Sequence, residues 1–202
     1  MSTLLATAAN LATDVAAWMS RADLTANIPT YIVLAESKLN RLLRSLEHET
    51  RNPAFVLTGE YVPVPADFLE FKHGYVNGNP KVPLEYLSTD LLPTYQGVTS
   101  AQYFTMSGTN FRFAPIPDGS TTASISYFVK LPTLSGAGTQ TNWLLRDHAD
   151  CYLYGVLLDA SAKIADPEQT QVWRNAVAQV ISHIINTDKR KRYGNGMAVR
   201  AA

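Results

Sequence analysis

Apolar residues recur at helical spacing near the start of the chain. From Ile28 to Leu46 they follow alternating steps of four and three residues, which places them in one stripe along a helix. This pattern predicts a helix over residues 25–46, with Pro29 at its start, where the N–H that proline lacks would have no helical partner. A weaker pattern predicts an earlier helix over residues 4–19. The polar face of the second helix is predicted to hold Glu36, Lys38, Asn40, Arg41 and Arg44.

The last third of the chain predicts a second pair of helices. Residues 143–165 carry a broad apolar stripe at helical spacing. The sequence Asp166-Pro167-Glu168 is a start signal for a helix over residues 167–187, because aspartate caps a helix, proline suits its first position and an acid favours its N-terminus. We therefore expect the helices from both ends of the chain to form one bundle.

Between the helices the pattern changes to short runs rich in Tyr, Phe, Val and Ile, divided by Gly, Pro and Asn. Alternation in NFRFA and SISYFV is typical of antiparallel strands with one buried face, and MSGTNFRF predicts a hairpin with Gly108 in its turn. STDLLPTY (88–95) predicts a short helical connector. The predicted fold is α+β: a helical bundle of residues 1–49 and 134–187, an inserted antiparallel β-sandwich-like domain at 50–133, and an extended basic tail at 188–202.

The formal net charge of zero hides an asymmetry along the chain. Residues 1–186 contain 12 Lys and Arg against 16 Asp and Glu, whereas residues 187–202 contain five bases against Asp188. An acidic body with a basic end suggests that the end has a partner of its own.

Several classes of protein are disfavoured by what the sequence lacks. Cys151 is the single cysteine, which excludes an internal disulfide, and no Cys/His spacing typical of zinc sites occurs. No run approaches the ~20 apolar residues of a membrane span, and no nucleotide-binding or hydrolase motif is present. We therefore expect a soluble protein that is not an enzyme and has no cofactor or metal.

One stretch does concentrate reactive side chains: Asp147, His148, Asp150 and Cys151 fall within five residues. On a helical wheel His148, Cys151 and Asp147 lie outside the main apolar stripe, and His148 and Cys151 could touch. A nucleophilic cysteine needs a base that a third group orients, and a metal needs ligands from converging elements. Neither requirement is met by one helical turn, so a structural role is favoured.

The same segment has a second, narrower apolar arc. It consists of Leu144, Cys151, Gly155 and Leu158. Glycine destabilises a helix interior by ~1 kcal/mol, so Gly155 suggests that another backbone passes close by. The arc is predicted to pack either between two elements of this chain or against a neighbouring subunit.

The basic C-terminal segment has three possible roles. It could be a solvated end, a nucleic-acid-binding segment that releases counterions from phosphates, or a peptide that docks along a partner protein. We favour docking, with these residues as candidates: Lys189, Arg190, Lys191, Arg192, Tyr193, Met197, Val199 and Arg200.

Three stretches together resemble the head-to-tail adaptor proteins of short-tailed bacteriophages, of the tail tubular protein A type. WMSRADLTANIPTYIVLAESKLNRLLR is similar to the family's "I-P-x-x-I-x-LAE-x-x-LNR-x-LR" opening. VPVPADFLEF followed by PLEYLS is similar to its "LP-x-DFLE … PL-x-x-x-S" strands. ISYFVKLPTLS…NWLLRDHADCYLYGVLLDASAKIADPEQTQVW is similar to its "P-x-LS…N-WLL…YLYG" ending, except that Ala149 replaces a common proline.

The resemblance implies a structural protein of the virion, located at the portal vertex between capsid and tail. Such a protein forms a ring, typically of twelve copies, that docks on the portal protein, carries the tail or nozzle proteins and lets genomic DNA pass without specific binding. The family's C-terminal segment commonly reaches along the portal, which supports the docking role of the basic end. Deleting residues 188–202 is expected to leave the fold intact and to weaken portal binding.

Two alternative functions remain open at this point. One is a tail-completion or tail-terminator ring. The other is a carbohydrate-binding β module, in which tyrosine rings would stack on sugars; its candidates are Tyr61, Tyr75, Tyr86, Tyr95 and Tyr103.

Overall fold

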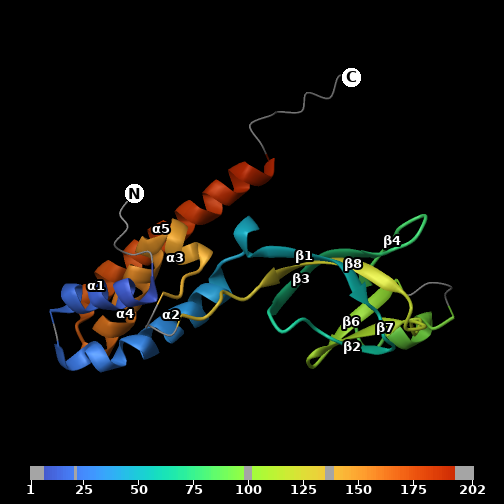
Figure 1. Ribbon diagram of the computed structural model, residues 1–202, viewed down its shortest axis with the longest axis horizontal. Coiled ribbons are helices and arrows are strands. Elements are labelled where there is room, and N and C mark those ends of the chain that lie inside the picture. Colours follow the sequence, from blue (N-terminus) through green and yellow to red (C-terminus); the bar gives the residue numbers. More distant parts are fainter. Residues whose placement is uncertain (1–6, 21, 98–101, 135–138, 194–202) are drawn as a thin grey trace, which may run out of the picture. The chain divides into compact units, whose positions relative to one another are not determined.

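The computed structural model describes residues 7–20, 22–97, 102–134 and 139–193. These residues form helices and antiparallel sheets, which confirms the α+β class (Figure 1). The chain divides into two compact units. The helical unit comprises Met1–Glu47 and Leu131–Ala202, and the β unit comprises His48–Lys130.

The helical unit is built from helices at both ends of the chain, which gather around one core in Figure 1. Tyr152 and Val156 are fully buried there, together with Leu11 and Ile32. Five α-helices lie in the part of the chain that the structure describes: α1 (Ala8–Met19), α2 (Ile28–Leu42), α3 (Trp143–Asp147), α4 (Ala149–Ile164) and α5 (Pro167–Tyr193). The 3₁₀ turns η2 (Ala22–Asn27) and η3 (Leu46–His48) precede and follow α2.

The sequence signals for helix starts are confirmed at two places. The carboxylate of Asp166 accepts a hydrogen bond from the backbone N–H of Gln169 at 3.0 Å, and Pro167 is the first residue of α5. Pro29 lies in the first turn of α2. The earlier predicted helix begins at Ala8 in the structure, and residues 1–6 lie outside the described part.

Two predicted helices have different lengths from those expected. The helix predicted over 25–46 is α-helical only over Ile28–Leu42, because Leu43 turns into extended backbone while its side chain stays fully buried. The helix predicted over 143–165 is two helices, divided at His148. Ala149, which replaces the proline of the resembled family, is the first residue of α4, a position that suits proline.

The C-terminal helix is longer than predicted. Helix α5 continues through residues 188–193, which were expected to be extended. The physical reason is a set of polar contacts between this helical turn and residues 44–47, described below. Residues 194–202 lie outside the described part of the chain.

The described residues of the β unit form two four-stranded sheets. The first has the order β1-β8-β3-β4, formed by β1 (Glu49–Val56), β8 (Thr122–Val129), β3 (Phe68–Val76) and β4 (Val82–Pro83). The second has the order β2-β7-β6-β5, formed by β2 (Tyr61–Pro63), β7 (Asn110–Ala114), β6 (Tyr103–Ser107) and β5 (Glu85–Tyr86). All pairs are antiparallel except β5 with β6.

Side chains from both sheets share one aromatic core. Phe111 on β7 is its centre, with ring centroids 5.2 Å from Phe68, 5.7 Å from Phe104 and 6.0 Å from Phe55. The predicted hairpin is confirmed as β6–β7, and Gly108 in its turn has the positive φ of +61° that favours glycine. The predicted connector at 88–95 is a 3₁₀ turn, η4, over Leu92–Tyr95.

Candidate functional site

A buried polar network joins the two ends of the chain inside the helical unit. The Glu36 carboxylate on α2, only 4% exposed, accepts hydrogen bonds from the backbone N–H of Leu134 (2.8 Å) and the hydroxyl of Tyr152 on α4 (3.2 Å). The prediction that Glu36 lies on the polar outer face of this helix is therefore wrong. Asn40, one turn later, accepts from the N–H of Leu131 at 2.8 Å. The polar residues of α2 thus hold the segment from Leu131 to Leu134, which follows the last strand of the β unit.

Asn142 completes this network at the start of α3. Its side-chain oxygen accepts from the N–H of Leu145 at 2.9 Å and so caps the helix. Its amide nitrogen donates to the Tyr152 hydroxyl (2.6 Å) and to the carbonyl of Pro132 (3.0 Å). These residues come from the first and the third of the stretches that resemble phage adaptors, and in the fold their polar groups satisfy one another.

Burial shifts the pKa values of the two titratable side chains in this network. Burial raises the pKa of Glu36 despite the hydrogen bonds from Leu134 and Tyr152, which lower it. Burial also raises the pKa of the Tyr152 phenol, and the nearby Glu36 adds to this shift. Both side chains are buried and have protein partners, so the network stabilises the bundle.

Replacing Glu36 should change how stability depends on pH. Because its pKa is higher in the folded chain than in the unfolded chain, folding favours the protonated carboxyl, and this contribution is lost as pH rises above the ordinary value of 4.5. We therefore compare the free energy of unfolding of the native chain with that of Glu36→Gln. The native value minus the variant value should decrease as the pH rises from 4.5 through the raised pKa of Glu36. Denaturant titrations of both proteins from pH 4 upward measure the difference. A constant difference would contradict the assignment.

The cysteine-containing stretch is structural. Cys151 is fully buried, and burial, with a smaller contribution from Asp150, raises the pKa of its thiol to about 12. Asp147 is paired with the guanidinium of Arg146 on the surface, so it does not act on the thiol. His148 lies at the break between α3 and α4, where its backbone closes both helix ends.

The Cys151 thiol is therefore expected to be inert in the folded protein. A thiol reagent should label it at least about 100-fold more slowly in the native chain than in denaturant, because reaction needs the thiolate and access to it. Absorbance after addition of an aromatic disulfide reagent measures both rates. Fast labelling of the native protein would show that this part of α4 opens readily.

No metal or membrane site emerges from the part of the chain that the structure describes. Within it, no group of three or more His, Cys, Asp or Glu side chains is arranged to hold a metal ion. Among the same residues, no helix is both long and apolar enough to span a bilayer.

The predicted subunit-contact residues are separated by the fold. Leu144 and Cys151 are completely buried in the core of this chain, so their side chains are not available to a second subunit. Gly155 and Leu158 instead line an apolar groove between α2, α4 and α5. Sequence periodicity could not separate these pairs, because all four residues fall on one arc of the same helical segment.

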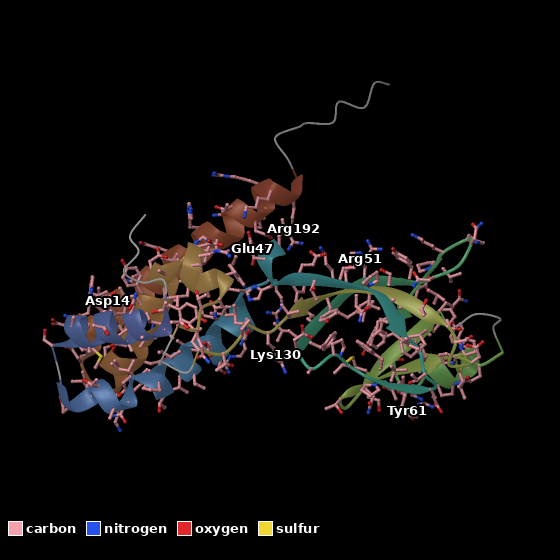
Figure 2. All side chains as sticks on the ribbon, in the orientation of Figure 1. Asp14, Glu47, Arg51, Tyr61, Lys130 and Arg192 are labelled. Atoms are coloured by element: carbon pink, nitrogen blue, oxygen red, sulfur yellow. The ribbon has the colours of Figure 1, made fainter. Side chains whose placement is uncertain are left out.

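The basic C-terminal cluster has two different roles in the structure. Lys191 forms an ion pair with Glu47, and Arg192 pairs with the buried Asp188 at 2.6 Å. Figure 2 shows Glu47 and Arg192 where the chain leaves the bundle. Lys189 and Arg190 point to solvent. Tyr193 ends α5, and the remaining docking candidates lie outside the described residues: Met197, Val199 and Arg200.

We call the contacts of Asp188, Lys191 and Arg192 with residues 44–47 the clamp. The clamp explains why α5 remains helical to Tyr193. The Asp188 carboxylate also accepts from the backbone N–H of Leu46 at 2.7 Å, and Arg192 donates to the carbonyl of Arg44 at 3.2 Å. Burial raises the pKa of Glu47, but its hydrogen bonds, chiefly that from Lys191, outweigh this and leave the pKa lowered. The last turn of α5 thus fixes residues 44–47.

Removing the centre of the clamp should destabilise the helical unit. Asp188→Ala should lower its free energy of unfolding by about 2–3 kcal/mol, because two hydrogen bonds to a buried charge are lost. Asp188→Asn, which keeps one acceptor for Leu46, should cost less, and Lys189→Ala should have almost no effect. Hydrogen exchange of the amides of α5 and residues 44–47 measures the loss. Equal protection in all variants would contradict the clamp.

The tyrosines proposed as sugar platforms do not form one free row. Tyr95 and Tyr103 contact each other, with ring centroids 4.4 Å apart, and the ring of Tyr75 is covered by Lys81 at 4.6 Å. Tyr61 (51% exposed, also labelled in Figure 2) and Tyr86 (62%) are exposed, but Arg112 lies over the Tyr61 ring at 5.6 Å and the Tyr86 ring contacts that of Phe104. Nothing in this arrangement favours a carbohydrate site.

Comparison with known proteins supplies the family. None of the curated proteins compared with the chain matches it. The SU10 adaptor protein family, however, matches residues 6–200, which is almost the entire chain. The three motif stretches and the buried network fall within this match. The chain therefore belongs to the SU10 adaptor protein family and is a structural adaptor of a bacteriophage.

Proposed function

We propose that this adaptor forms a ring of identical copies, expected to number twelve, that docks on the portal protein at the capsid vertex. The ring lengthens the DNA channel and gives the tail or nozzle proteins a surface to bind, as in adaptors of the tail tubular protein A type. The observation that carries this proposal is the family match over residues 6–200. It extends through both units, so the whole chain participates.

The distribution of charge supports a channel role. The 12 bases and 16 acids of residues 1–186 give the body a net negative charge, which would repel passing DNA. Several fixed cation–phosphate contacts in each copy would instead hold the duplex and slow its passage. DNA is therefore expected to pass through the lumen without specific binding.

The end of the chain is the proposed portal-binding element, but not all of its basic residues are free to bind the portal. Lys191 and Arg192 hold residues 44–47, so they serve the fold first. Lys189 and Arg190 are exposed and can meet acidic groups of the portal. A deletion from residue 188 would remove the clamp as well as the tail, so the truncation that isolates docking removes residues 194–202.

Sedimentation with purified portal rings tests the proposal. The full chain should co-sediment with the portal, and the chain lacking residues 194–202 should keep its helical content but bind at least about tenfold more weakly. Tail tubes form the control arm. Binding to tail tubes and not to the portal would favour the alternative, a tail-completion or terminator ring. Unchanged portal affinity after truncation would remove the docking role of the tail.

A further inference from the structure

An apolar groove crosses the surface of the helical unit between α2 and α5. Its cavity measures about 210 Å³, and its lining includes Ala35, Leu42, Gly155, Leu158, Val177 and Ile181. We call it the α2–α5 groove. Leu42 is 57% exposed, although it is a large apolar side chain. Contiguous exposed apolar surface of this kind marks sites of protein contact.

Gly155 keeps the floor of the groove open. A Cβ atom added there would meet only the Cβ of Ala35, at 3.5 Å, which is ordinary contact. The fold of the single chain therefore does not require glycine at this position, although glycine destabilises a helix interior by ~1 kcal/mol relative to alanine. The missing side chain deepens the groove where α4 faces Ala35 on α2, although Gly155 itself is buried.

The apolar surface continues along α5 beyond the groove. Ile185, which is 36% exposed, follows Ile181 by one helical turn. The groove together with this extension can receive a short extended or looped segment.

The charged residues in the lining of the groove are basic. Lys38 is paired with Asp159, and Arg174 contacts only the side-chain oxygen of Gln171, at 3.4 Å, within the described residues. An occupant with apolar tips and acidic neighbours would match both the lining and its charge.

The β unit presents a segment with these properties. In Glu85–Leu91, Tyr86 and Leu91 are 62% and 53% exposed, each is preceded by an exposed acid, and the segment contains no base. It is also held in place, because Glu85 donates to the carbonyl of Gln102 and Leu87 to that of Phe104, both through their backbone N–H groups. A fixed segment loses little entropy on binding.

We infer that the α2–α5 groove receives the Glu85–Leu91 segment of a second copy of this chain. The groove and the segment are different surfaces, so each copy binds one neighbour through its groove and another through its segment. Such head-to-tail contacts close into a ring when the rotation between neighbouring copies permits it. The inference rests on the proposed ring and names the contact between its subunits.

Charge reversal in the full chain tests the contact. Arg174→Glu in the groove and the pair Glu85→Lys with Asp90→Lys in the segment should each weaken self-association at least tenfold. The groove and segment changes combined in one chain should restore part of it. All three positions are exposed, so circular dichroism should stay unchanged. Asn175→Asp, an exposed change one residue away, is the matched control.

Mixing the single-surface variants gives a second readout. The groove variant retains an intact segment, the segment variant retains an intact groove, and the two altered surfaces carry opposite charges, so the mixture should recover larger assemblies than either variant forms alone in native mass spectrometry. Association is measured both in solution and on portal rings. Unaltered assembly by all variants would overturn the inference while leaving the ring intact. A native chain that assembles in neither setting would contradict the proposed ring and the inference with it.

Discussion

Tyr152→Ala should be among the most destabilising single changes in the helical unit. The Tyr152 side chain is fully buried, and its hydroxyl donates to Glu36 and accepts from Asn142. Truncation leaves a large cavity, which costs about 3–5 kcal/mol for aromatic residues. It also leaves two buried polar partners with one bond fewer. We expect the free energy of unfolding to fall by at least about 4 kcal/mol.

The conservative variant separates the two contributions. Tyr152→Phe keeps the ring and removes only the hydroxyl, so it should cost about 1–3 kcal/mol. Hydrogen exchange of α4 amides reports the stability of this unit without contributions from the β unit. If Tyr152→Phe cost as much as Tyr152→Ala, cavity formation would have no part, and the packing argument would be wrong.

Phe111→Ala should have a comparable effect in the β unit. Phe111 is 1% exposed and its ring contacts five others: Phe55, Phe68, Phe71, Phe104 and Phe113. These contacts link the two sheets, so truncation removes the centre of their common core. The expected loss is about 3–5 kcal/mol.

Denaturant unfolding followed by exchange of β6 and β7 amides measures the loss at Phe111. Ile116→Ala is the matched control, because Ile116 is apolar but 56% exposed, and it should change stability by less than about 0.5 kcal/mol. Similar losses in both variants would show that the two sheets do not depend on a shared core.

The sequence predicted the elements well where local chemistry decides them. Asp166-Pro167 starts α5 through one hydrogen bond and one fixed dihedral angle, both set by neighbouring residues. Gly108 marks the β6–β7 turn for the same reason. The length of α5 was missed because its last turn is stabilised by Leu46, which is 142 residues away in sequence from Asp188.

The candidate site was harder to predict, because its polar residues are buried. Glu36 was assigned to solvent by helical periodicity, although its partners, Leu134 and Tyr152, come from the other end of the chain. One signal was available. Asn142 directly before Trp143-Leu144-Leu145 has the position of a helix cap, which identifies it as a polar residue with a structural role at the start of the predicted helix.

The resemblance is confirmed at the level of a phage adaptor protein, and the tail tubular protein A type stays a prediction. The residue patterns alone indicated only an α+β protein without a catalytic motif. Charge clustering then led to one role for all four bases of Lys189–Arg192. In the fold, Lys191 and Arg192 form ion pairs with Glu47 and Asp188 of the same chain. The clustering of basic residues in the sequence does not show which of them already form ion pairs within the fold.

Electron microscopy of portal rings incubated with the purified chain shows whether the chain assembles on the portal. We expect an additional ring of density on the portal face that meets the tail, coaxial with the channel and absent when the chain is omitted. Portal rings that look the same with and without a saturating amount of the chain would contradict it.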